Sequence, residues 1–225
     1  MFWDDEYKNN KYIWGEGPGE LAVAALKYLK QYKPGNELPH ILDIGCGYGR
    51  DAFYFLKNLN CKILGIDVAE KAIDIAIDAI PETQRENVAF QHCDFVDIEE
   101  ASYDIIYISN LYHLLKKDER EAIGKTVIKA LKTNGLLFLS ALSARDPEHY
   151  GKGIPVQGEY NSFQDKTYTH LCTGEELSKD FAFLSIKELY EHEYYEPRAT
   201  GETHHHILWI LVGEREDSQG LAPGF

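Results

Sequence analysis

Short apolar runs alternate with segments of helical periodicity through the first two thirds of the chain. The runs at residues 41–44, 62–66, 88–91, 104–108 and 136–142 have the length of buried strands. Apolar side chains recur at helical spacing in 20–33 before the first run, and in 52–59, 73–80 and 123–131 after it. Strands that are apolar on both faces and alternate with helices predict a parallel sheet covered on both sides. Because crossovers between parallel strands are right-handed, we expect a doubly wound α/β sheet.

The last third of the sequence departs from this alternation. Residues 143–172 show little periodicity, which predicts a long irregular segment of the kind that forms lids or binding loops. Thr173 and Glu176 form a capping-box pattern and predict a helix over 173–180. Runs at 184–190 and 206–212 predict two antiparallel strands joined by residues 191–203. We expect one domain over 1–215, with an N-terminal lid and helix at 1–36, an insertion at 143–172 and a flexible tail at 216–225.

The charge and the cysteine content limit the classes of binding partner and the cellular compartment that we expect. The chain has 23 Lys and Arg against 37 Asp and Glu, a formal net charge of −14. A phosphate-coated partner would be repelled, so nucleic acid and anionic membrane are not expected. The four cysteines form no CxxC pair and predict reduced thiols in the cytoplasm. We expect a monomer or homodimer with a small-molecule ligand.

The stretch "DIGCGYGRD" follows the first predicted strand and places Gly45, Gly47 and Gly49 at alternate positions. A chain that turns tightly from a strand into a helix, or lets a ligand approach its backbone, needs glycine there. The dinucleotide fingerprint is G-x-G-x-x-G, and here Arg50 takes the place of its third glycine. The spacing, with Asp43 two residues before the first glycine, differs from the usual NAD pattern. A tight turn without a ligand is the plain alternative.

Residues 39–142 resemble the class I S-adenosylmethionine-dependent methyltransferases. The family's first motif is an acidic residue followed by x-G-x-G-x-G, and "DIGCGYG" matches it throughout. "GIDVAEKAI", "QHCDFVDI" and "YDIIYISNLYHLL" resemble the later motifs and occur in the family's order. The resemblance implies a seven-stranded, mostly parallel sheet whose last strand is antiparallel, with S-adenosyl-L-methionine as cofactor.

The resemblance also implies the cofactor contacts. Asp43 would lie near the ammonium group, Asp67 would accept the ribose hydroxyls, and Asp94 would accept the adenine amino group. The Phe95 backbone would reach an adenine ring nitrogen, and Ser109 would line the cofactor side. The remaining cofactor-binding residues that we predict are Gly45, Cys46, Gly47, Gly49, Val68 and Asn110.

Three stretches carry a narrower resemblance, to the tellurite-resistance and thiopurine methyltransferase group: "WGEGPGELA", "SARDPEHYGKG" and "ETHHHILWILVGER". Enzymes of that group methylate small, soft nucleophiles. Family topology would bring the 143–172 insertion and the 191–203 connection to the substrate side. We predict substrate contacts from Arg145, His149, Tyr150 and Arg198. Tyr12 and Trp14 would either cover the cofactor or pack at the domain edge.

The histidines permit several interpretations. His204 and His206 share one face of a strand, since side chains alternate there. With His113 they are the predicted catalytic residues, as a base or as substrate contacts; half-exposed residues without a special role are the alternative. Metal ligation together with His170 or His113 is a third possibility, but two ligands on one strand are too few, so no metal site is predicted.

The sequence thus predicts a methyltransferase for a small-molecule acceptor, with a thiol or chalcogen oxyanion as the candidate soft nucleophile. The alternatives are an NAD(P)-dependent oxidoreductase on the same architecture and a non-catalytic protein that binds S-adenosylmethionine.

Overall fold

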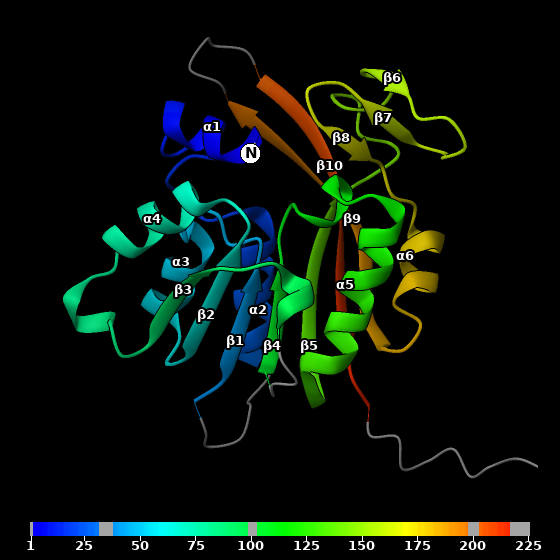
Figure 1. Ribbon diagram of the computed structural model, residues 1–225. Helices are drawn as coiled ribbons and strands as arrows, with labels where there is room; N and C mark the ends of the chain where they lie inside the picture. Colours follow the sequence, from blue (N-terminus) through cyan, green and yellow to red (C-terminus); the bar gives the residue numbers. More distant parts are fainter. Residues whose placement is uncertain (1, 32–37, 99–102, 198–202, 217–225) are drawn as a thin grey trace, which may run out of the picture.

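Seven strands form one twisted sheet at the centre of the molecule (Figure 1). The computed structural model describes residues 2–31, 38–98, 103–197 and 203–216. The strand order is β3-β2-β1-β4-β5-β10-β9. β10 is antiparallel to both of its neighbours and the other pairs are parallel, which confirms the predicted fold. The strands are β1 (His40–Ile44), β2 (Lys62–Asp67), β3 (Val88–His92), β4 (Tyr103–Ile108), β5 (Leu131–Leu142), β9 (Ser185–Pro197) and β10 (Thr203–Glu214).

Helices cover both faces of the sheet. α2 (Glu20–Gln31), α3 (Arg50–Asn58) and α4 (Glu70–Asp78) share one apolar core with one face, while α5 (Lys117–Ala130) and α6 (Gly174–Asp180) share another with the opposite face.

Strand β4 supplies both cores because its side chains alternate. Ile105 and Tyr107 pack on the α3 side, whereas Ile106 and Ile108 pack on the α5 side. All four are at most 4% exposed, and each such buried side chain contributes about 1.5–3 kcal/mol. The polar ends of the parallel strands are thereby held at one edge of the sheet.

Residues 143–172 are more regular than predicted. They contain β6 (Ile154–Pro155), β7 (Ser162–Gln164) and β8 (Tyr168–His170), which form a separate antiparallel sheet. The prediction of a segment without regular structure is therefore wrong. Strands of two or three residues are too short to show a hydrophobic period. β6 is exposed, whereas Phe163 of β7 is buried in a small core with Leu142, Leu171 and Leu208.

The predicted 191–203 connection is also mostly strand, since β9 runs to Pro197 and β10 begins at Thr203. β9 is an edge strand, so the polar "EHEYYEP" stretch can form hydrogen bonds with β10 without burying its side chains. β5 begins at Leu131, five residues before the predicted start, and passes through Asn134 at a φ of 61°. The capped helix is confirmed as α6, where the Thr173 side chain accepts the Glu176 N–H.

The N-terminal segment adds a helix that we did not predict, α1 (Phe2–Asn9), which lies across the top of the sheet (Figure 1). Short 3₁₀ turns follow α4, β3 and β4: η1 (Glu82–Gln84), η2 (Phe95–Asp97) and η3 (Tyr112–Leu114). Residues 32–33 of the first predicted helix, 217–225 of the predicted tail and Arg198 lie outside the described residues. No helix in the described ranges combines the length and apolar character needed to cross a membrane.

Candidate active site

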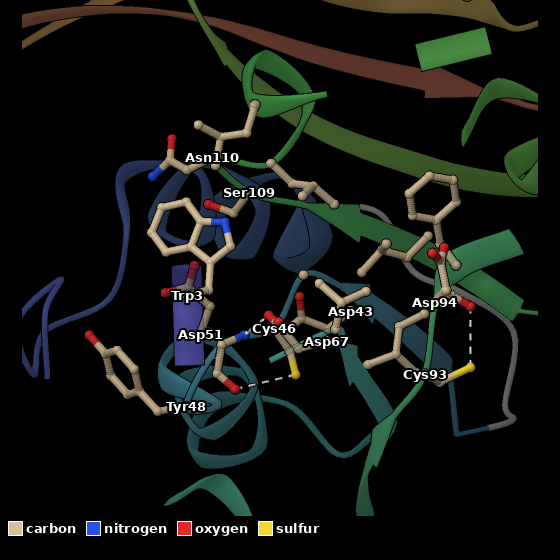
Figure 2. A pocket seen from close by; sticks show the side chains of 18 of the residues that line it. Trp3, Asp43, Cys46, Tyr48, Asp51, Asp67, Cys93, Asp94, Ser109 and Asn110 are labelled. Carbon is tan, nitrogen blue, oxygen red and sulfur yellow. Dashed lines mark hydrogen bonds between the residues drawn. The ribbon is translucent and has the colours of Figure 1, made fainter. Parts of the chain in front are cut away.

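A cavity of about 370 Å³ opens at the C-terminal edge of the parallel strands. Its walls come from the loop after β1, the end of β2, η2, the residues after β4, and the N-terminal segment. Figure 2 shows the carboxylates of Asp43, Asp51 and Asp67 gathered near Cys46, with Asp94 and Cys93 toward one side. In an open α/β sheet this edge is where ligands bind.

The glycine loop forms the floor of this cleft. Gly45, Gly47 and Gly49 have φ values of 76°, 53° and 77°, a region that side chains rarely adopt. The Gly45 and Cys46 N–H groups both donate to the Ile66 carbonyl, which ties the loop to β2. A Cβ on Gly47 would lie 2.8 Å from the Tyr7 hydroxyl oxygen, and one on Gly49 would lie 2.6 Å from the Phe90 ring.

Asp43 is the most unusual group in the cleft. Its side chain is 2% exposed, and its Oδ2 atom has no hydrogen-bond partner among the described residues. Burial, and then the nearby carboxylates of Asp51 and Asp67, hold the pKa of Asp43 well above its usual range. A buried carboxylate oxygen without a donor is costly, so a cationic donor from a ligand would relieve it.

Asp67 and Asp94 are held by backbone amides. The Asp67 carboxylate accepts the N–H groups of Gly47 and Ala69, each at 2.8 Å. Burial raises the pKa of Asp67 and these hydrogen bonds oppose the rise. Asp94 caps η2 by accepting the Val96 N–H at 3.1 Å. Both carboxylates are thus fixed in direction before any ligand arrives.

The cleft carries a surplus of negative charge. Besides Asp43, Asp67 and Asp94, it is lined by Asp51 and Glu119, and Arg50 is the one lysine or arginine among the lining residues. The Arg50 Nε lies 3.2 Å from Asp51 Oδ1, so this cation is already paired. Asp51 also accepts from the Tyr107 hydroxyl and the Gly19 N–H. The electrostatics favour a cationic ligand.

Aromatic side chains from the N-terminal segment close the cleft from above. Trp3 and Trp14 line it with ring centroids 6.2 Å apart, and Tyr7 lies beside Tyr48 at 6.1 Å. Tyr12 packs against the Tyr48 ring at 5.4 Å and is not among the lining residues. Sequence reasoning singled out Trp14 and missed Trp3 and Tyr7, although their i,i+4 spacing is a helical signal.

The predicted cofactor residues come together, whereas the predicted histidines lie elsewhere. Every predicted cofactor residue lines the cleft except Gly49, and so does Ser109. His113 is 7% exposed, accepts the Leu142 N–H at its Nδ1, and burial lowers its pKa to about 3. His206 is buried beside Asp146, while His204 is half-exposed on the same strand face, 6.1 Å from the His206 ring.

The three predicted substrate residues that the structure describes, Arg145, His149 and Tyr150, also lie outside the cleft lining. Arg145 is 75% exposed and pairs with Glu191 at 2.6 Å. His149 contacts Asp146 at 2.8 Å, and Tyr150 packs against the Phe163 ring. Their role toward an acceptor stays a prediction.

Residues 41–135 match the family model described as a methyltransferase domain. An uncharacterized methyltransferase of Schizosaccharomyces pombe is 29% identical over 113 residues, covering 49% of this chain and 77% of the relative. The matched residues form a class I S-adenosylmethionine-dependent methyltransferase domain. A second relative of the methyltransferase, the S. pombe tRNA N(3)-methylcytidine methyltransferase trm140, is 26% identical over 196 residues, covering 78% of this chain and 61% of the relative.

Solved structures agree with this fold. The methyltransferase superposes on the Burkholderia thailandensis 1,6-didemethyltoxoflavin-N1-methyltransferase, solved with S-adenosylhomocysteine, at a TM-score of 0.66 and 17% identity, with 95% and 85% of the two chains covered. TehB from Haemophilus influenzae is also similar, at a TM-score of 0.65 and 16% identity over 95% and 67% of the chains. At these identities the likeness concerns the fold.

S-adenosyl-L-methionine, the cofactor of this class, fits the cleft. Its ammonium and sulfonium groups are positively charged, and the cleft holds an unpaired buried carboxylate oxygen and a surplus of carboxylates. Gly47 has no side chain at a position where a Cβ atom would clash with the Tyr7 hydroxyl, so the backbone is accessible to a ligand there.

Proposed function

We propose that this methyltransferase transfers the methyl group to a small-molecule acceptor that is already nucleophilic, such as a thiol or a chalcogen oxyanion. The observation that carries the proposal is the absence of any histidine or lysine among the described residues that line the cleft. An alcohol or a protonated amine would need a base with a pKa near neutrality, whereas a thiolate or oxyanion needs little activation.

The other titratable groups in the cleft support this choice. Burial raises the pKa of Tyr7, so its phenol stays protonated and cannot act as a base. Glu119 accepts the Lys116 N–H at 2.7 Å as part of a helix cap, and Asp67 accepts two backbone amides. These carboxylates are occupied by structural roles and are poorly placed to remove a proton from an acceptor.

The proposed cofactor contacts follow from the carboxylates. Asp43 would accept from the ammonium group, Asp67 from the ribose hydroxyls, and Asp94 from the adenine amino group, with the Phe95 backbone beside it. The loop of Gly45, Cys46 and Gly47 would support the methionine portion. Val68 and Asn110 would complete the walls.

The cofactor supplies a methyl group on a sulfonium, which is a good leaving group. The protein then has to align the acceptor and exclude water, and such positioning can contribute about 7–11 kcal/mol. Trp3 and Trp14 are placed to exclude water from above. We propose that residues 1–36 act as the lid and that the insertion at 143–172 forms the acceptor side of a single domain over 1–215.

The net negative charge of the chain supports a small-molecule acceptor rather than a nucleic acid. With a net charge of −14, the chain would repel a tRNA, although one relative is named as a tRNA methyltransferase. The four cysteines are unpaired thiols, which suits a reducing cytoplasmic compartment. A monomer or homodimer remains the expected state.

The test is turnover on a panel of acceptors with radiolabelled S-adenosylmethionine. The panel contains small thiols, selenite and tellurite, small amines, and total tRNA. We expect transfer to the thiols or chalcogen oxyanions and none to tRNA. Transfer confined to amines or to tRNA would contradict the proposed acceptor class while leaving the cofactor assignment intact.

A further inference from the structure

Two imidazoles and one carboxylate meet beside the sheet, outside the cofactor cleft. Asp146 and His149 lie in the turn after β5, and His206 lies on β10. One imidazole nitrogen from each histidine and one carboxylate oxygen all lie within 4.8 Å of one another. No metal site was predicted from the sequence, because two histidines on one strand are too few ligands; the other two residues of this cluster lie far from that strand along the chain.

We propose that Asp146, His149 and His206 bind one divalent transition-metal ion, with Zn²⁺ as the best fit. His206 Nδ1 lies 3.4 Å from Asp146 Oδ2, and His149 Nδ1 lies 2.8 Å from Asp146 Oδ1. Two ligands about 2.1 Å from a tetrahedral zinc ion are about 3.4 Å apart, so small side-chain rotations suffice. Each imidazole binds the ion through Nδ1 as the neutral tautomer with its proton on Nε2, so a proton is released only from a histidine that was an imidazolium before binding.

The carboxylate is positioned for this role by the backbone. Asp146 is 0% exposed, and its oxygens accept the N–H groups of Glu148, His149 and Ile207 at 2.8–3.0 Å. Such outer contacts orient a ligand and reduce the cost of assembling the site. The His206 side chain is 7% exposed and that of His149 is 41% exposed, so an ion can arrive from the His149 side.

Three protein ligands leave at least one coordination position for water or another molecule. His113 is close to this cluster but does not serve as the fourth ligand. Its Nδ1 accepts the Leu142 N–H, so its proton resides on Nε2.

A second cluster of His170, Cys172 and Glu176 has similar spacing but the wrong chemistry. The two ring nitrogens of His170 already contact Ser162 Oγ at 2.8 Å and Glu176 Oε1 at 2.7 Å. The Arg120 guanidinium lies 3.9 Å from Glu176 and disfavours a cation. Burial holds the pKa of the Cys172 thiol well above its usual range, which disfavours the thiolate ligand.

The experiment is calorimetric titration of chelator-treated full-length protein with Zn²⁺, with Co²⁺ as an absorption probe. We expect one Zn²⁺ per chain and weak tetrahedral d–d bands with Co²⁺. His149→Ala and His206→Ala should each weaken binding by at least about 100-fold, the upper end of the loss seen when only an outer partner is removed. His40→Ala, at the distant start of β1, and His170→Ala should bind as the wild type does.

Thermal melting checks that each variant folds. If the buried His206 variant is unstable, His149→Ala decides the matter alone, because that side chain is partly exposed. Unchanged Zn²⁺ affinity in His149→Ala, or loss of binding in His170→Ala, would overturn the proposal. A strong sulfur-to-cobalt charge-transfer band would do the same, because it would assign the ion to cysteine.

Discussion

At the scale of single residues, the buried Asp43 carboxylate is unfavourable for the ligand-free fold and favourable for a cationic ligand. Its raised pKa means that folding shifts this carboxyl toward its neutral form, relative to an exposed aspartate. The stability that this group contributes is therefore present at low pH and is lost as pH rises through its folded pKa. A bound cation reverses the balance by stabilising the carboxylate.

Replacement of the charge separates these two effects. Asp43→Asn should raise the melting temperature of the ligand-free protein at neutral pH, because a buried charge near two other carboxylates is removed. It should weaken S-adenosylhomocysteine binding by about 10–100-fold, since a hydrogen bond to a charged group contributes about 1.5–3 kcal/mol. Calorimetry and thermal melting measure the two effects. Asp104→Asn, at the opposite end of the sheet, serves as the control, and equal affinities in both variants would refute the Asp43 contact.

The same residue predicts a pH dependence. Because the ligand favours the ionised form of Asp43 and burial favours the neutral form, cofactor affinity should increase as pH rises through the folded pKa. Binding below that pKa should release a proton, which calorimetry in two buffers of different ionisation enthalpy detects. A pH-independent affinity without proton release would show that Asp43 does not ionise on binding.

Glycine substitutions distinguish a turn from a ligand-approach site. Gly47→Ala should lose stability because φ is 53°, and should also lose cofactor binding because its Cβ would displace the Tyr7 hydroxyl 2.8 Å away. Gly151→Ala is the matched control, with a φ of 76° and nothing within 4 Å of the added Cβ. Both should be destabilised by about 1 kcal/mol, and only Gly47→Ala should fail to bind in calorimetry. Retained binding in Gly47→Ala would contradict the close approach.

At the scale of elements, α1 packs through a small apolar cluster separate from the two main cores, in which Tyr7 lies with Tyr48. Its Asp4 side chain accepts the Lys71 N–H at 3.1 Å, and Trp3 and Tyr7 reach the cleft on the same face. An element that is attached through one small cluster can open at lower cost than an element of the main cores, as lids generally do.

The lid role makes a kinetic prediction. Trp3→Ala should speed S-adenosylhomocysteine release by about 10-fold, a loss of about 1.4 kcal/mol, because aromatic cover over the cleft is removed. Phe2→Ala removes a neighbouring ring of α1 that does not line the cleft, and should leave release unchanged. Stopped-flow fluorescence gives both rates. The lid interpretation would not survive equal release rates in the two variants.

Helices and strands could be predicted where the segment is long enough to show a hydrophobic periodicity. The five parallel strands and their helices follow from residues such as Ile105–Ile108, which alternate between two cores. β6 and β7 are too short to show a hydrophobic period, so the small sheet could not be predicted. β9 is a polar edge strand, so its full length could not be predicted either. In the site, Asp43, Asp67 and Asp94 were found through motif order. Trp3 and Tyr7 were not, because nothing in the sequence places α1 above the cleft.

At the scale of the whole molecule, the net charge of −14 and the acidic cleft act together. They attract cations and repel phosphate-rich polymers at distances up to about 8–10 Å at physiological salt. A total tRNA pool should therefore show no shift in an electrophoretic binding assay at physiological ionic strength. Salt-sensitive tRNA binding, or methylation of it, would contradict this account of the surface.

The central claim is that the cleft between the Gly45–Gly49 loop, Asp67 and Asp94 binds the methyl donor. Isothermal titration of the purified protein with S-adenosylhomocysteine, and separately with NADH, tests it most directly. We predict one molecule of S-adenosylhomocysteine bound per chain, weakened by Asp67→Ala, and no heat with NADH. Saturable binding of NADH with no heat from S-adenosylhomocysteine would contradict it.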